Sequence, residues 1–144
     1  MRARLLISLF VVASALLAAG SEEPLETLKQ RAATANEGER PRLFLEIAER
    51  QLRAADAAYS QGSVDQGKAA VTEVADYCEK AAAAAASSRK HLKHTEIKIR
   101  DLSRRLGGML RSVSFDDREP LQAALDRMEK ARSGLLTAMF GLKS

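Results

Sequence analysis

The sequence predicts an all-α protein in which antiparallel helical hairpins share one long central helix. The first observation is that apolar or small residues recur at intervals of three and four throughout residues 63–113, the spacing of a coiled-coil seam. The second is that amphipathic stretches on either side, residues 41–61 and 120–140, are long enough to fold back along the two halves of that helix. The seam residues are Val71, Val74, Cys78, Ala81, Ala85, Ser88, Leu92, Thr95, Ile99, Leu102, Leu106, Met109 and Val113.

The first twenty residues have the composition of a signal peptide. Arg2 and Arg4 precede an apolar run over residues 5–17, and small residues follow it. The run is shorter than the roughly twenty apolar residues of a membrane-spanning helix. We therefore expect cleavage before Ser21 and an exported protein, periplasmic or secreted, with retention as an N-terminal anchor as the alternative. Residues 21–144 then form a single helical domain.

Charge and cysteine content narrow the class of protein. The chain has 23 basic and 19 acidic side chains, a net charge of +4, which falls to +2 once Arg2 and Arg4 are removed. This near balance, together with export, predicts no nucleic-acid partner. The single cysteine, Cys78, excludes an internal disulfide. It lies on the seam, where we expect a buried thiol, with an intermolecular disulfide as the alternative.

Two helices are predicted before the central one. Ser21 is a candidate N-cap for a short helix over residues 22–35, and Pro41 begins a second, amphipathic helix over residues 41–61. Gly62 is placed to end that helix, and Ser63 with Gln66 has the spacing of a capping box for the next one. A connection this short makes the two helices antiparallel.

Around this connection the sequence resembles the centre of one tetratricopeptide unit. The residues that carry the resemblance are Ala55, Ala58, Tyr59, Gln61, Gly62, Asp65, Gly67 and Val71. The match covers about twenty residues in a single copy, whereas repeat proteins need about three copies to stack a core. It implies a helical hairpin and does not carry over peptide binding. As a whole, the exported chain also resembles small exported all-helical bacterial proteins of unknown function, a likeness that brings no functional residues with it.

The middle of the central run offers an alternative architecture. Residues 81–86 are all alanine, the strongest helix former, and Ser87 and Ser88 follow as the candidate position for a kink. A break there would close a compact four- or five-helix bundle in place of a long rod. Gly107 and Gly108 weaken the helix by about 1 kcal/mol each relative to alanine, so a bend or fraying is expected there as well.

The last helix is predicted over residues 120–140. Asp116 and Asp117 are candidate caps, Pro120 lies in the first turn, and Gly141 ends the helix. If the central helix is straight, several apolar residues of this hairpin have nothing to cover them. We then expect either docking of the N-terminal helix or self-association as a homo-oligomer. The uncovered residues are Leu110, Leu136, Phe140 and Leu142.

No arrangement of residues points to catalysis, a metal or a cofactor. His91 and His94 lie one turn apart and could offer two metal ligands, but cations flank His94 and no acidic residue or cysteine completes a site. A pH-responsive patch is the second reading of this pair. The sequence contains no G-x-S-x-G motif and no glycine loop that follows a strand. We therefore predict a protein that is not an enzyme.

A basic segment is the one feature that points to a function. Eight cations lie within residues 89–111, and a solvated helix face is the simplest explanation for them. The alternative is contact with an anionic polymer or membrane surface in the cell envelope. Our leading hypothesis is an exported scaffold or adaptor that acts through protein–protein contacts, with anionic-surface binding as the alternative. The residues assigned to that surface are Arg89, Lys90, Lys93, Lys98, Arg100, Arg104, Arg105 and Arg111.

Overall fold

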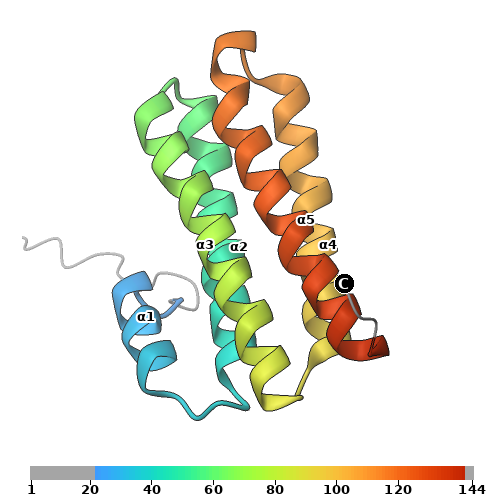
Figure 1. The fold of residues 1–144 in the computed structure, drawn as a ribbon. Helices are drawn as coiled ribbons and strands as arrows, with labels where there is room; N and C mark the ends of the chain where they lie inside the picture. Colours follow the sequence, from blue (N-terminus) through green and yellow to red (C-terminus); the bar gives the residue numbers. More distant parts are fainter. Residues whose placement is uncertain (1–21, 142–144) are drawn as a thin grey trace, which may run out of the picture.

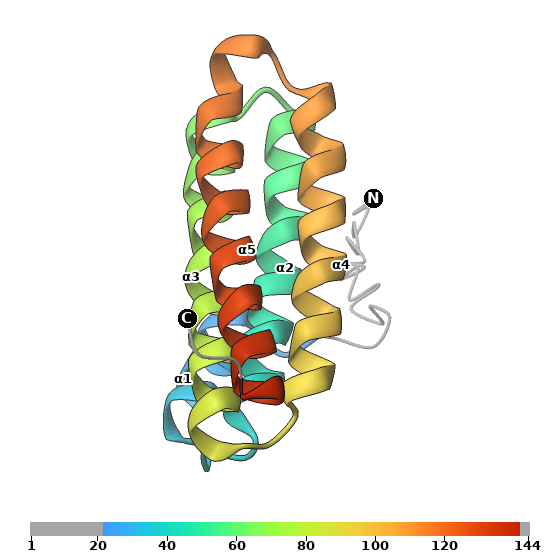
Figure 2. The same cartoon turned by 45° about the vertical axis from the view of Figure 1, so that its right-hand side comes forward.

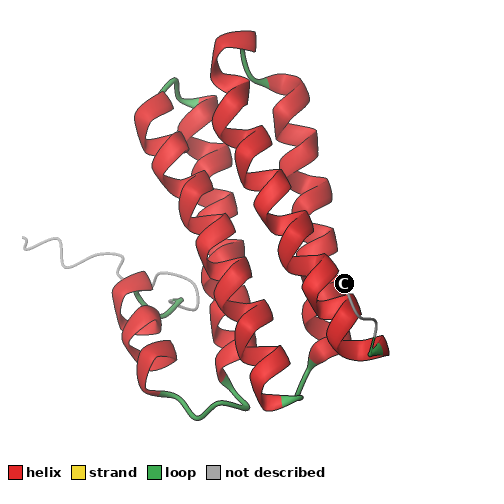
Figure 3. Cartoon of the chain, viewed as in Figure 1, coloured by secondary structure: helices red, strands yellow, loops and turns green. Residues whose placement is uncertain are grey.

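The computed structural model describes residues 22–141, and all of the regular secondary structure in that range is helical (Figure 1 and Figure 3). The long helices α2 to α5 lie side by side as a bundle, and the short first helix covers one side of it (Figure 2). The predicted all-α class is confirmed, in its compact five-helix form. The elements are α1 (Leu25–Thr34), α2 (Arg40–Ser60), α3 (Val64–Ser88), α4 (Leu92–Ser112), the 3-10 turn η1 (Phe115–Asp117) and α5 (Arg118–Phe140). The predicted signal peptide, Ser21 and Leu142 lie outside the described residues.

The predicted continuous helix over residues 63–113 is wrong, because the chain turns sharply after Ser88. Arg89 and His91 both adopt left-handed backbone conformations, with φ of 58° and 60°. The hydroxyl of Ser88 donates to the carbonyl of Ala84 (2.8 Å) and accepts the backbone N–H of Lys90 (3.2 Å), which stabilises the helix end. This conformation costs non-glycine residues about 1–2 kcal/mol. Because Arg89 and His91 adopt it here, no glycine marks the turn in the sequence.

The heptad seam nevertheless runs through this turn without a slip. Ser88 and Leu92 are four residues apart, as they would be on one helix. After the turn, α4 buries Ile99 in the same core that α3 lines with Ala81 and Ala85. Two antiparallel helices that bury one core can therefore keep the same spacing as one continuous helix, and periodicity alone does not separate the two.

The first hairpin, α2 with α3, follows the predicted turn. Gly62 has a φ of 76°, its N–H donates to the carbonyl of Tyr59 (3.2 Å), and the N–H of Ser63 donates to that of Ala58 (2.8 Å). These are the two hydrogen bonds of a Schellman motif. The predicted capping box is wrong, since the Ser63 side chain makes no capping hydrogen bond. The backbone carbonyl of Ser63 accepts the N–H of Gly67 (3.0 Å), which is the first hydrogen bond of α3.

The second hairpin, α4 with α5, begins and ends close to the predicted residues. Gly107 and Gly108 lie inside α4 and do not interrupt it. A turn containing η1 connects the two helices, and α5 begins at Arg118. The predicted aspartate cap is wrong, because Asp117 makes no side-chain capping bond; its backbone N–H donates to the carbonyl of Ser114 (2.9 Å).

The short helix α1 docks on the first hairpin. Leu28 and Ala32 are fully buried and form a small apolar cluster with Ile47 of α2. Lys29 Nζ lies 2.9 Å from Glu73 Oε2 of α3. In Figure 1, α1 lies on the far side of the first hairpin from α4. Docking of this helix on the second hairpin, one of the two alternatives expected for a straight central helix, does not occur; α1 contacts α2 instead.

The two hairpins cover each other through one continuous core. Val74 and Cys78 of α3, Leu106 of α4 and Met128 of α5 belong to the same cluster of buried residues. The prediction that Cys78 is buried is confirmed, because none of its surface is exposed. Burial raises the pKa of the Cys78 thiol to about 12, with a smaller contribution from Glu79, so the thiol stays protonated at neutral pH.

Candidate interaction face on α4 and α5

The buried side of α4 determines which cations of the predicted basic segment face solvent and which face the neighbouring helices. Ile99, Leu102 and Leu106 are buried against the core. Glu96 is also buried, and its carboxylate accepts a hydrogen bond from Arg132 Nε of α5 (2.6 Å). On another side of α4, Arg105 Nη1 lies 3.4 Å from Glu49 Oε1 of α2. Glu96 therefore marks the side of α4 toward α5, and Arg105 marks the side toward α2.

The structure brings only some of the eight predicted cations together. Arg89 and Lys90 lie in the α3–α4 turn, where Arg89 Nη1 donates to the carbonyl of Ala138 (2.9 Å). Lys98, like Arg105, lies on the side of α4 that faces α2, and it lines a hollow of about 150 Å³ with Glu46 and Glu49. These four cations are dispersed or lie beside carboxylates, so they do not form one surface.

The other four cations form a straight line on the exposed side of α4. We call it the basic line, and it includes the two other residues that continue its spacing of four and three. In this line only Arg104 forms an ion pair within residues 22–141, with Asp101 one turn away (3.5 Å). Its residues are Lys93, Ile97, Arg100, Arg104, Gly107 and Arg111, of which all but Gly107 are exposed.

A second line, which the sequence interpretation missed, runs along α5. It is rich in carboxylates, continues into two apolar residues, and again has a spacing of three and four. We call its polar part the acidic line: Glu119, Gln122, Asp126, Glu129 and Ser133, followed by Leu136 and Phe140. Every member is exposed except the half-buried Leu136. The 3–4 spacing of acidic and amide side chains over residues 119–133 is the signal that could have revealed it.

Both lines lie on the outer face that α4 and α5 form together. The basic line is adjacent to Glu96, which points to α5, and away from Arg105, which points to α2. The acidic line is adjacent to Arg132, which points to α4, and away from Arg127, which contacts Asp76 and Glu79 of α3 (2.5 Å each). The second hairpin therefore presents parallel basic and acidic lines to its surroundings.

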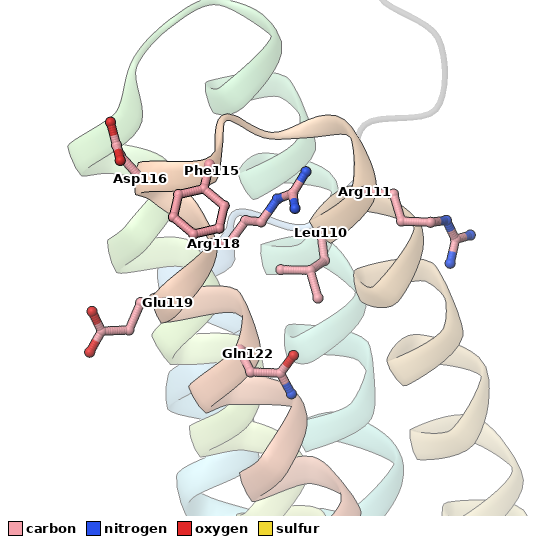
Figure 4. Close-up of a pocket in the computed structure, with 7 residues that line it drawn as sticks. All are labelled: Leu110, Arg111, Phe115, Asp116, Arg118, Glu119 and Gln122. Carbon is pink, nitrogen blue, oxygen red and sulfur yellow. The ribbon is translucent and has the colours of Figure 1, made fainter.

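One end of this face carries an exposed aromatic ring. Phe115 is 81% exposed, and the Arg118 guanidinium lies 5.9 Å from its ring centre. With Leu110 they line an open hollow of about 810 Å³ (Figure 4). The figure shows Glu119 and Arg111 pointing to opposite sides, so the polar groups do not converge as they do around a small ligand.

The predicted histidine pair does not form a metal site within residues 22–141. His91 lies in the left-handed turn, whereas His94 is in the first turn of α4 and lines the hollow shared with Glu46 and Glu49. No group of three or more histidine, cysteine or carboxylate side chains in this range could hold a metal ion. In the same range, no helix is long and apolar enough to cross a membrane.

Comparisons with protein-family models, with curated proteins and with solved structures found no match to this chain. Its class is therefore defined by the structure alone. It is a compact bundle of five helices whose last hairpin exposes a face of mixed charge.

Proposed function

We propose that this protein is a non-enzymatic helical scaffold or adaptor of the cell envelope, which acts through protein–protein contacts made by the face of α4 and α5. Export rests on the signal-peptide composition of residues 1–20. The proposal assigns no catalytic residue, metal or cofactor to the chain.

One observation carries the proposal: the basic line and the acidic line lie beside each other on the same exposed face. An anionic polymer or membrane carries charge of one sign, so the carboxylates of the acidic line repel it while the basic line attracts it. A protein surface can match both signs and gains specificity by doing so. The mixed charge therefore favours a protein partner over a uniformly anionic one.

The alternative is binding of an anionic envelope polymer or membrane through the eight cations of residues 89–111. All eight are exposed, which supports it. Against a membrane, Ile97 is the one large apolar side chain exposed on the basic line, at 41%. A helix that lies on a bilayer buries a wide apolar face, which this line does not have.

Site-directed photo-crosslinking in native cells tests the proposal. A photoreactive amino acid at Gln122, in the middle of the face, should give protein adducts that are sensitive to salt. The same amino acid at Ala69, which is exposed on α3, serves as the control and should give few adducts. Adducts with phospholipid or polysaccharide from Gln122 would support the alternative, and equal yields from the two positions would argue against a specific face.

A further inference from the structure

We infer that the face of α4 and α5 binds the same face of a second copy of this chain, with α4 of each copy lying along α5 of the other. The inference rests on the proposed function and identifies the protein that binds this face as a second copy of the chain.

The positions of charges along the two helices are the first argument. α4 and α5 are antiparallel, and Glu96 pairs with Arg132, so these residues lie at the same level of the bundle. By that register, Arg100 is level with residues near 128, Arg104 with residues near 124 and Arg111 with residues near 117. Each arginine of the basic line therefore lies within about one helical turn of the level of a carboxylate in the acidic line.

The symmetry of the contact follows from the signs of these charges. A two-fold axis parallel to the helices keeps every residue at its own level and places α5 of one copy over α4 of the other. Arg100, Arg104 and Arg111 then face Glu129, Asp126 and Glu119 of the second copy. The other two-fold axis in the plane of the face, perpendicular to the helices, places basic line on basic line, which like-charge repulsion disfavours.

The uncharged positions also match under this symmetry. Gly107 comes level with Gln122 of the second copy, and Ile97 with Ser133. A Cβ added to Gly107 would meet nothing within 4 Å in the chain itself, so internal packing does not require glycine there. Its missing side chain leaves room for a second helix to approach α4 closely. At the lower end of the face, the aliphatic part of Lys93 comes level with Leu136.

Three of the four cations of the basic line have no acidic partner among the described residues. Within residues 22–141, Lys93, Arg100 and Arg111 form no ion pair, and residues 1–21 and 142–144 contain no aspartate or glutamate. In the acidic line, Asp126 accepts a hydrogen bond from Gln122 (3.0 Å) and Glu129 pairs with Arg132 (2.8 Å). Both interactions lie within α5 and are exposed to solvent, so a second copy can replace them. Glu119 forms no ion pair within residues 22–141.

The size of the face predicts a weak dimer. Two helices of this length present roughly 30 Å by 20 Å, so a face-to-face contact buries on the order of 1,200 Å² in total. That area is at the lower limit of specific protein interfaces. Because exposed ion pairs supply much of the attraction, salt should weaken the dimer strongly.

Charge reversal with complementation tests the inference, using sedimentation velocity of the purified exported protein at low and high salt. Arg104→Glu and Asp126→Arg should each raise the dimer dissociation constant roughly a hundredfold, because each change occurs twice in a symmetric dimer. An equimolar mixture of the two variants restores both pairs and should dimerise like the wild type. Arg53→Glu is the matched control, because it makes the same charge change at an exposed arginine of α2 that, like Arg104, forms one ion pair, and it should have no effect.

The orientation can be tested by cysteine crosslinking. Gly107→Cys and Gln122→Cys variants, mixed and treated with a short bifunctional reagent, should give a crosslinked dimer, whereas neither variant should do so alone. Cys78 is fully buried and should not interfere.

Three results would overturn the inference. These are a wild-type protein that stays monomeric at about millimolar concentration in low salt, a mixture of the charge variants that is not rescued, and an equal loss in the Arg53→Glu control. Failure of the inference can be distinguished from failure of the proposed function. Crosslinks from Gln122 to a different protein, in a chain that is monomeric when purified, leave the adaptor function standing and exclude the dimer.

Discussion

The two hairpins share one core but differ in the side chains that they bury and in what they expose to solvent. The first hairpin brings α2 and α3 together through small residues such as Ala55, Ala70 and Gly67, and α1 covers part of its outer surface. The second hairpin buries larger side chains, among them Leu106 and Met128, and its outer face has no cover within the described residues. Both hairpins bury one side in the common core, and the second presents the outer face on which the basic and acidic lines lie side by side.

The largest effect should come from core deletions, which test whether the hairpins form one folding unit. Leu52→Ala in the first hairpin and Leu106→Ala in the second remove side chains that are at most 1% exposed. Each should lower the free energy of unfolding by about 2–5 kcal/mol. Urea denaturation followed by circular dichroism should show a single transition for both. A separate transition of one hairpin in the Leu106→Ala variant would mean that the second hairpin is an independent addition.

Substitution of two arginines of α5 compares an ion pair within the second hairpin with ion pairs between the hairpins. Arg132→Met leaves the Glu96 carboxylate, whose side chain is 7% exposed, without its partner, and should cost about 2–3 kcal/mol. Arg127→Met breaks pairs with Asp76 and Glu79 that are much more exposed, and should cost less than about 1 kcal/mol. Urea denaturation measures both costs. Adding Glu96→Gln to Arg132→Met should recover part of the loss, and no recovery would contradict the buried-charge explanation.

Glycine substitutions should have opposite signs in the two hairpins. A Cβ on Gly67 would lie 2.7 Å from Cε2 of Tyr59, so Gly67→Ala should destabilise the protein by about 1–2 kcal/mol in spite of its better helix propensity. Gly134 of α5 has open space around it, so Gly134→Ala should stabilise by up to about 1 kcal/mol. Thermal unfolding measures both changes. In a Tyr59→Ala background, Gly67→Ala should no longer destabilise.

Local signals were sufficient to predict most of the fold from the sequence. Gly62 ends α2 with a positive φ, and the apolar spacing identifies the buried sides of α3, α4 and α5. The break at Arg89 was not predicted as the main architecture, because non-glycine residues make the turn and the seam continues through it. The helix α1 begins at Leu25, three residues later than predicted, because Pro24 has an extended backbone (ψ 142°) and precedes the helix in place of lying in its first turn.

The candidate face was predictable only in part. The eight cations were identified from their density along the chain, but density does not separate Arg105, which lies beside Glu49, from Arg100, which forms no pair within residues 22–141. That distinction depends on which helices are neighbours. The acidic line was missed because its residues were considered only as parts of one amphipathic helix. Its significance appears once α5 is known to lie beside the exposed side of α4.

The last effect depends on pH and concerns Cys78, which tests how completely the core around α3 excludes water. Because burial raises its pKa in the folded protein to about 12, the thiol contributes stability that is fully present below its unfolded pKa and is lost as pH rises toward 12. Tyrosine and lysine titrations overlap this range, so the measured quantity is the difference between the wild type and Cys78→Ala. From pH 9 to pH 10 the wild type should lose about 1 kcal/mol more than the variant. Parallel pH profiles, or rapid alkylation of the folded protein at pH 8, would mean that water reaches the thiol. In that case the core around Cys78 would be accessible to solvent.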